Sequence, residues 1–385
     1  MNLQKINIIG AGPAGLYFAI LMRDCFPEAE IRIFDRARAD DIAGWGIVIN
    51  QGTVRLLKKF DPDSYEEIIK QSRQWSDVVM RYKGEQIVVR GKDYISMSRN
   101  VLVSALRKRC KALGIEIIFE KNISEVSEFE DCDLLVGADG ARSTVRQTYV
   151  DSFQTSVDYR RDRFIWLGTK CKFDTITHII RQTPTGIFTA ECYPYSDTHS
   201  SFILTFSEET WQNSGFEAMS VEETVNYMTD VFADDLEGNP LLFDAVSHWR
   251  QFPHITNRHW SHKNIVLIGD ALRTAHFSIG SGTRLAIEDT IVAAQCLSTC
   301  ESVPEALQEF ENRRRPLMER LENVAFESMQ WFENVEDYID LDIIPFTYEI
   351  MTRTSSLGEK SLKLTDPEFL KRYQDYQSSG GQANA

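Results

Sequence analysis

The stretch IIGAGPAG, residues 8–15, decides the fold, because its glycines separate an apolar segment from a helical pattern. A strand is predicted at 5–9, a helix at 12–25 and a second strand at 30–35, which together form a βαβ unit. In such a unit the first glycine permits a tight turn, the second lets the backbone approach a pyrophosphate, and the third permits close helix–strand packing. The predicted dinucleotide-binding residues are Gly10, Gly12, Pro13, Ala14 and Gly15.

The acid at the end of the second predicted strand supports this interpretation. Asp35 follows Gly15 by 20 residues, where a carboxylate can accept hydrogen bonds from the adenosine ribose, and Arg36 stands beside it. The free N–H groups at the start of the helix offer partial positive charge to phosphates. The pattern predicts a dinucleotide but does not distinguish FAD from NAD.

Length and composition narrow the class of protein. The 385 residues are 43% hydrophobic and 26% charged, which predicts a globular protein with two domains, or one domain with a large insertion. A formal net charge of −15 argues against nucleic acid as a partner. The seven cysteines are scattered without a zinc-binding pattern, and no apolar stretch is long enough to span a membrane. We therefore expect no metal site, no membrane span and a cytoplasmic location.

Two later apolar segments also end in a turn that contains an acid. DLLVGADG (133–140) places Asp139 and Gly140 after a buried strand, and NIVLIGD (264–270) places Gly269 and Asp270 in the same way. After these turns the sequence pattern predicts the beginning of another helix, with two glycines near its first residues: Gly280, Ser281, Gly282 and Thr283.

The middle and the end of the chain follow other patterns. Residues 160–206 contain short strands at regular spacing, which predict an antiparallel sheet, and residues 78–90 predict a hairpin around Lys83-Gly84. A long helical pattern runs from Pro304 to about Tyr338, with Pro316 as a break or kink. The predicted fold class is α/β (α+β): a Rossmann-like domain with an inserted antiparallel β-sheet and C-terminal helices.

The ordered turns resemble those of the class A flavoprotein monooxygenases, the aromatic hydroxylases of the p-hydroxybenzoate hydroxylase type. The resemblance covers nearly the whole chain. Segments 163–169 (RFIWLGT), 249–290 and 331–342 (WFENVEDYIDLD) are similar to the salicylyl-CoA and 2-aminobenzoyl-CoA hydroxylase branch. Segments 44–49 (GWGIVI) and 195–210 are also similar to the tryptophan-derived hydroxylase of violacein assembly.

This resemblance implies an FAD-binding domain of the glutathione-reductase type that is interrupted by a substrate domain. The FAD-binding parts are expected at 1–72, 95–157 and 258–303, and the substrate domain at 73–94 (a hairpin) and 158–257 (the antiparallel sheet). C-terminal helices are expected at 304–375 and a flexible tail at 376–385.

The resemblance also implies roles in holding FAD. Asp270 bonds the ribityl chain, and Asp139-Gly140 lies near the pyrophosphate and the path of the nicotinamide. Residues 280–283 border the flavin ring, and the helix that they begin directs its positive end toward flavin N1. Arg99 neutralises phosphate or ribityl oxygens, unless it is an exposed arginine at a helix end.

The loop that contains Trp45 and Gly46 is expected along the flavin, and Trp45 itself either borders the flavin or is an ordinary packing residue. The chain departs from its relatives at two positions: His276-Phe277 replaces a common Pro-Pro pair, and Arg273 replaces a frequent histidine. Details of ring mobility in the family therefore do not transfer to this chain.

The predicted catalytic residues are His276, Phe277 and Gly280. His276 is either a base that removes a proton from a phenol or amine, or a wall residue of the cavity. Tyr193 and Tyr195 come from the inserted sheet, and they either bond the substrate or belong to the core.

The activity that the resemblance implies is FAD-dependent hydroxylation of an electron-rich ring through a C4a-hydroperoxyflavin, with NADPH or NADH and O2. The expected substrate is a salicylyl or 2-aminobenzoyl compound, free or as its CoA thioester, or an indole. Two alternatives stay open, a flavin-dependent reductase or halogenase on the same scaffold and a non-catalytic flavin- or NAD-binding protein. The sequence fits either a monomer or a homodimer.

Overall fold

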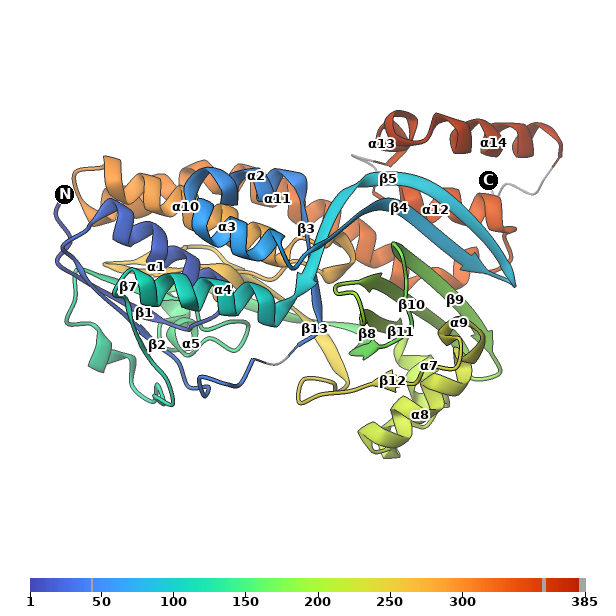
Figure 1. Cartoon of the computed structure of the whole chain (residues 1–385), viewed down its shortest axis with the longest axis horizontal. Coiled ribbons are helices and arrows are strands. Elements are labelled where there is room, and N and C mark those ends of the chain that lie inside the picture. The colour runs from blue at the N-terminus through green and yellow to red at the C-terminus, as the bar shows by residue number, and fades with distance from the viewer. Residues whose placement is uncertain (43, 355–357, 381–385) are drawn as a thin grey trace.

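A computed structural model describes residues 1–42, 44–354 and 358–380 of the chain. Two sheets lie toward opposite ends of an elongated molecule, with helices packed around both (Figure 1). The longest helix, α11 (Val303–Glu333), contacts both α10 (Gly282–Thr299), beside the first sheet, and strand β11 (Ser200–Phe206) of the second. The two parts of the molecule therefore share helical support.

The first sheet has the order β14–β15–β7–β1–β2–β6, and all of its pairs are parallel except β14 with β15. Its strands are β1 (Lys5–Ile9), β2 (Glu30–Phe34), β6 (Glu116–Ile118), β7 (Leu134–Gly137), β14 (Ser261–His262) and β15 (Ile265–Leu267). The carboxyl ends of β1, β7 and β15 therefore meet at one edge of the sheet. The predicted βαβ unit is confirmed, with α1 at Pro13–Cys25.

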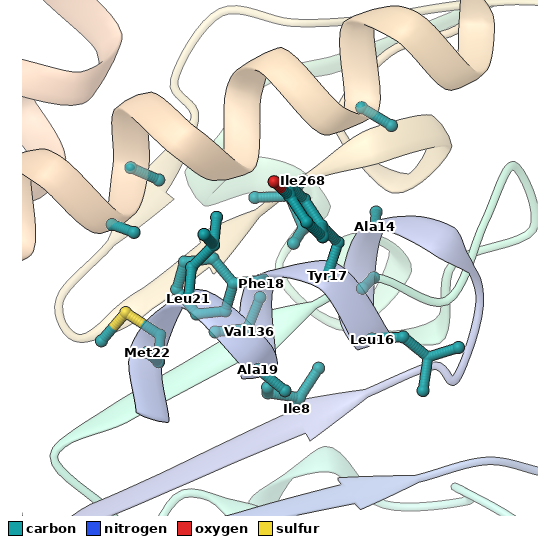
Figure 2. Close-up of a cluster of buried hydrophobic side chains, with 14 of the residues drawn as sticks. Ile8, Ala14, Leu16, Tyr17, Phe18, Ala19, Leu21, Met22, Val136 and Ile268 are labelled. Carbon is teal, nitrogen blue, oxygen red and sulfur yellow. The ribbon is translucent and has the colours of Figure 1, made fainter. Parts of the chain in front are cut away.

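Helix α1 is buried between this sheet and α10. Every residue from Ala14 to Met22 is buried, as expected for a helix that is apolar on all sides. Figure 2 shows Tyr17 and Phe18 of α1 in a cluster with Val136 and Ile268, which come from the two later strand ends. The core thus joins the segments that carry the predicted FAD-binding turns.

The second sheet has nine strands and is antiparallel except where β4 pairs with β9. Its order is β12–β8–β11–β10–β9–β4–β5–β3, and β13 pairs with β8. Its other strands are β3 (Gly46–Asn50), β4 (Arg73–Tyr82), β5 (Glu85–Ser98), β8 (Thr155–Thr169), β9 (Ile176–Thr183), β10 (Gly186–Pro194), β12 (Leu241–Leu242) and β13 (Arg250–Asn257). The predicted hairpin turn at Lys83-Gly84 is present, and both residues have positive φ.

Long strands connect the two parts of the chain. The expected domain boundaries at 94/95 and 157/158 fall inside the continuous strands β5 and β8. Strand β3, expected in the FAD-binding part, pairs with β5 in the second sheet. The expected domain boundaries lie where the residue pattern of the sequence changes. The strands β5 and β8 continue through these positions, so the pattern change does not mark the end of a strand.

The remaining helices surround the sheets. They are α2 (Gln51–Phe60), α3 (Pro62–Ile69), α4 (Arg99–Ala112), α5 (Thr144–Thr148), α6 (Val150–Phe153), α7 (Glu208–Asn213), α8 (Val221–Val231), α9 (Ala233–Leu236), α12 (Ile343–Thr352), α13 (Gly358–Thr365) and α14 (Pro367–Ser378). Short 3-10 turns occur at η1 (Val126–Phe129), η2 (Phe216–Ala218), η3 (Gly269–Ala271), η4 (Phe277–Ile279) and η5 (Val335–Tyr338).

Two expectations for the C-terminal region need correction. Helix α11 continues through Pro316, so the expected break is wrong, and the alternative of a kink stays a prediction. Residues 376–378, expected in a flexible tail, belong to α14, where the Tyr376 hydroxyl donates to Asp342 at 2.6 Å. The end of the expected tail, residues 381–385, lies outside the described residues.

A buried ion cluster joins the segment after η3 to α10 and α11. Asp289 of α10 accepts hydrogen bonds from Arg273, which follows η3, and from Nε of Arg314 on α11 at 2.7 Å. All three side chains are at least 94% buried, so each charge depends on its partners for compensation. The arginine that replaces the family's frequent histidine thus anchors the turn of Asp270 to the helices behind it.

Replacing Asp289 with alanine should strongly destabilise the protein, because two buried guanidinium groups lose the carboxylate that they share. We expect the free energy of unfolding to fall by about 3–5 kcal/mol, measured by urea denaturation of the FAD-loaded protein. The control is Glu309→Ala, which removes a surface ion pair with Arg313 and should change stability little. Equal stability of the two variants would contradict this account of the cluster.

Candidate active site

The three predicted turns meet at one edge of the first sheet. Gly10 has φ +113°, and a Cβ atom there would overlap the backbone carbonyl of Ala138, the residue before Asp139. Gly269 has φ +59°, and its Cβ would lie 2.9 Å from the Cβ of Ala14. These contacts require glycine at both positions and bring segments more than 100 residues apart into direct contact.

The converging turns present groups that fit a bound dinucleotide. Neither Gly12 at the start of α1 nor Ser281 at the start of α10 supplies a side-chain cap, so the helix N–H groups stay available to an anion. A Cβ atom would meet nothing within 4 Å at several of the turn glycines, namely Gly12, Gly140, Gly280 and Gly282. One carboxylate oxygen of Asp139, Oδ1, is buried without a hydrogen-bond partner. The residues present therefore fit FAD.

Asp35 braces the glycine turn. Its carboxylate accepts hydrogen bonds from the backbone amides of Ala11 and, at 2.8 Å, of Ala37, while Arg36 is exposed. The ribose contact expected for Asp35 stays a prediction. The observed bonds hold the second strand end against the turn that would carry the phosphates.

Asp270 and Arg99 lie near each other on the open side of the site. Asp270 is accessible to solvent, but the surrounding protein is dense enough that burial raises the pKa of its carboxyl, while Arg99, Arg273 and Arg146 lower it. Arg99 is half-buried at the start of α4, and its side chain packs against Gly44. This position favours the cofactor-binding interpretation of Arg99 over that of an exposed helix-end residue.

The loop of Trp45 and Gly46 is joined to the second sheet. The Trp45 indole packs on Gly168, and its Nε1 donates to the Trp166 carbonyl at 3.1 Å. The amide of Gly46 donates to Ser201 Oγ at 2.9 Å. These contacts support the packing interpretation of Trp45, which attaches the loop to the second sheet.

The two predicted substrate tyrosines are also packing residues. The Tyr193 hydroxyl donates to the carbonyl of Gly46 at 2.8 Å, and its ring is buried. Tyr195 is buried against Gly46, whose Cβ would lie 2.6 Å from the Cβ of Tyr195. Neither residue lines the cavities described next, and the expectation that they bond the substrate stays a prediction.

Two adjoining cavities lie beside η4, between α11 and the second sheet. The wall that they share is formed by Thr205, His276, Phe277 and Phe332. The first cavity is also lined by Arg160, Asp162, Phe164, Phe252, Met329 and Glu333, and the second by His178, Ile180, Thr189, Ala190, Glu191, Ile203 and Ser278. The predicted pair His276-Phe277 therefore separates the helix start at residues 280–283 from a space lined by aromatic and polar groups.

His276 is held as a neutral imidazole. Burial, together with the positive charges of Arg160 and Arg353, lowers its pKa to about 3. The amide of Ser278 donates to Nδ1 at 3.3 Å, which leaves the proton on Nε2. A ring in this state can donate a hydrogen bond but is a poor proton acceptor at neutral pH, so the geometry favours the wall interpretation over the base.

The sequence analysis missed the polar groups on the opposite wall. Glu191 of β10 and His178 of β9 line the second cavity, and Arg353 follows α12 behind it. Glu191 stands in the strand GIFTAECYP and shares a strand face with Thr189 and Tyr193, so its charge in an otherwise apolar and neutral strand was a usable signal. Arg353 lies in no recognisable motif.

No group of three or more His, Cys, Asp and Glu side chains within the described residues is arranged to hold a metal ion. No helix within them combines the length and the apolar character that a membrane crossing requires.

Comparison with known proteins gives consistent matches. A family model described as an FAD binding domain matches residues 112–325. Salicyloyl-CoA 5-hydroxylase of Streptomyces sp. is 36% identical over 96% of this chain and 73% of its own length. Protodeoxyviolaceinate monooxygenase of Chromobacterium violaceum is 34% identical over 92% of this chain and 95% of its own.

Solved structures share the fold. A variant of 2-methyl-3-hydroxypyridine-5-carboxylic acid oxygenase has a TM-score of 0.72 with 18% identity, covering 90% of this chain and 96% of its own. At this identity the similarity concerns the arrangement of helices and sheets.

Replacing Gly12 with valine should weaken FAD binding without impairing the folding of the protein. A side chain at Gly12 meets no protein atom, so the apoprotein should keep its thermal midpoint, while the side chain blocks the approach of a pyrophosphate. We expect at least a tenfold loss of FAD affinity, measured by fluorescence titration. Gly10→Val is the contrast, because its side chain overlaps Ala138 and should impair folding itself. Normal FAD affinity in Gly12→Val would contradict the assigned turn.

Replacing Asp270 with alanine should weaken FAD retention while leaving the fold intact, because the carboxylate is solvent-accessible and accepts no hydrogen bond from the described residues. The ratio of flavin to protein after gel filtration measures the effect. Asp151→Ala, an exposed substitution on α6, is the control. Unchanged flavin content in Asp270→Ala would contradict the prediction that Asp270 bonds the ribityl chain of FAD.

Proposed function

We propose, since the chain belongs to the family of FAD-dependent aromatic monooxygenases, that its substrate is a benzoyl ring with an ortho hydroxyl or amino group. The ring is presented as a free acid or as a CoA thioester. The observation that carries this proposal is the 36% identity to salicyloyl-CoA 5-hydroxylase over nearly the whole chain. An indole-derived substrate is the second candidate, and the similarity to protodeoxyviolaceinate monooxygenase favours it.

The residues that would hold FAD lie on the three turns and the two helix starts. They are the glycine turn at 10–15 with Asp35, Arg99 at α4, Asp139-Gly140, Gly269-Asp270, and residues 280–283 at the start of α10. Bound FAD would take electrons from NADPH or NADH and activate O2 for transfer to an electron-rich ring carbon. The N-terminus of α10 offers partial positive charge that stabilises an anion beside it.

An aromatic ring bound beside η4 would lie next to these residues, and the walls of the two cavities, which are narrow in this structure, would have to move apart to admit it. Phe277 stacks on His276 with ring centroids 4.3 Å apart, and Phe164 lies 4.9 Å from Phe277. Together with Phe332 they form apolar walls that hold a ring and exclude water, which protects the oxygen transfer from wasteful side reactions.

Family membership favours a monooxygenase over the reductase, halogenase and non-catalytic alternatives. Reduced nicotinamide as the electron donor, O2 as the second substrate and a cytoplasmic location are parts of the same proposal. The choice between monomer and homodimer stays open in it.

The direct experiment is turnover under isotopically labelled O2 with salicyloyl-CoA, 2-aminobenzoyl-CoA, their free acids and indole compounds. We expect substrate-stimulated oxidation of NADPH or NADH and a product that carries one labelled oxygen atom, detected by mass spectrometry. Consumption of reduced nicotinamide without label in any product would overturn the hydroxylase proposal in favour of a reductase or an oxidase.

A further inference from the structure

A carboxyl group and an imidazole face each other across two strands at the wall of the second cavity. Glu191 of β10 and His178 of β9 are direct partners in the antiparallel register. His178 Nδ1 lies 4.0 Å from Glu191 Oε2, too far for a hydrogen bond. Among the described residues, no backbone or side-chain group donates a hydrogen bond to the Glu191 carboxylate.

The titratable groups around Glu191 are His178, Tyr94, Tyr193, His276 and Arg353, and of these Arg353 is the one that acts on its pKa as a charge. Arg353 directs its N–H groups elsewhere, to Ser278 O at 2.9 Å, to Ser328 Oγ at 2.8 Å and to Ile350 O at 2.6 Å. It therefore acts on Glu191 through space and leaves the carboxylate oxygens available.

These surroundings set the protonation states on this wall. Burial raises the pKa of Glu191 to about 7, and Arg353 limits that rise. Burial also lowers the pKa of His178 to about 3, so its imidazole is neutral and supplies no positive charge to Glu191. Burial raises the pKa values of Tyr94 and Tyr193, which keeps both phenols neutral. The carboxyl is therefore the group on this wall that changes its charge near neutral pH.

We propose that Glu191 is the residue that accepts the hydrogen bond, and then the proton, of the substituent next to the acyl group on the substrate ring. This inference rests on the proposed function, because it takes the occupant of the cavity to be an ortho-substituted aromatic ring. For a phenol, the substrate O–H bond breaks, an O–H bond forms on Glu191, and the electron pair remains on the ring oxygen. That pair raises electron density at the ring carbons ortho and para to the oxygen. An amino substituent donates a hydrogen bond to the same carboxylate.

The position of Glu191 suits this task. The cavity that it lines is bounded on another side by His276, Phe277 and Ser278, which stand a few residues before 280–283 in the chain. A ring bonded to Glu191 would therefore have the segment that leads into the proposed flavin-binding residues along another wall. His276 can donate from Nε2 to a second oxygen of the substrate, which divides acceptor and donor roles between two walls.

Two variants separate proton acceptance from binding. Glu191→Gln keeps an oxygen that can accept a hydrogen bond but cannot take a proton, whereas Glu191→Leu removes the acceptor. Both are compared as FAD-loaded enzymes, with Glu349→Gln of α12 as the matched control, because the pKa of that partly buried glutamate is also raised by burial and it lies outside the cavities.

The probes are salicyloyl-CoA and 2-methoxybenzoyl-CoA, which lacks the donor. Their dissociation constants are measured on oxidised enzyme without nicotinamide. We expect the wild type to prefer the hydroxyl probe about tenfold, Glu191→Gln to keep most of this preference, and Glu191→Leu to lose it.

The pH profile provides the second readout. As pH rises through about 7, Glu191 loses its proton and becomes the acceptor, so kcat/KM for hydroxylation should rise with an apparent pKa near 7. In Glu191→Gln this rise should disappear, with a loss of about 100-fold at pH 8. Burial also raises the pKa of Asp162, which lines the adjoining cavity, to about 7, so it is the loss of the rise in Glu191→Gln that assigns it to Glu191.

The outcomes distinguish the two proposals. A wild type that hydroxylates salicyloyl-CoA, with a Glu191→Gln variant that keeps the wild-type rate or the rise near pH 7, overturns the inference alone. So does a wild-type profile without that rise. A wild type that neither binds nor hydroxylates any of the ring compounds overturns the proposed function and the inference with it.

Discussion

The rest of the structure depends on the contact of three backbone turns at the carboxyl edge of the first sheet. Adjacent parallel strands lie about 4.8 Å apart, so turns that follow β1, β7 and β15 compete for very little space. Gly10 admits the Ala138 carbonyl, and Gly269 admits Ala14, because neither glycine carries a Cβ atom. This close approach directs the N-termini of α1 and α10 to the same region and creates a site for an extended anion between them.

The position of the cavities is fixed by strands that belong to both parts of the molecule. Strand β5 leaves the second sheet and leads directly into α4, where Arg99 stands, while β3 holds the Trp45 loop against the substrate domain. The indole of Trp45 packs on Gly168, and the Tyr193 hydroxyl bonds to Gly46. Trp45 and Tyr193 are aromatic residues of the kind that often contact ligands, but here they pack between the loop at residues 45–46 and the second sheet.

The sequence predicts what is encoded locally. Glycine turns with a flanking strand and helix carry their own short-range signal, so the βαβ unit, the later acid turns and the antiparallel sheet are confirmed. The pairing of Glu191 with His178 depends on the register of two strands, and the roles of Trp45 and Tyr193 depend on contacts with distant segments. Such tertiary effects leave little trace in a window of neighbouring residues, which is why the wall of the cavity was missed.

Burial reverses the usual order of the pKa values of a histidine and a glutamate in this cavity. In water a histidine titrates close to neutrality and a glutamate well below it, which makes His276 the natural choice from sequence. Loss of solvent disfavours the charged form of either group, so it lowers the pKa of the imidazole and raises that of the carboxyl. With His276 at about 3 and Glu191 at about 7, the carboxyl is the group suited to exchange a proton at neutral pH. The same physical effect therefore makes one wall a fixed donor and the other a titrating acceptor.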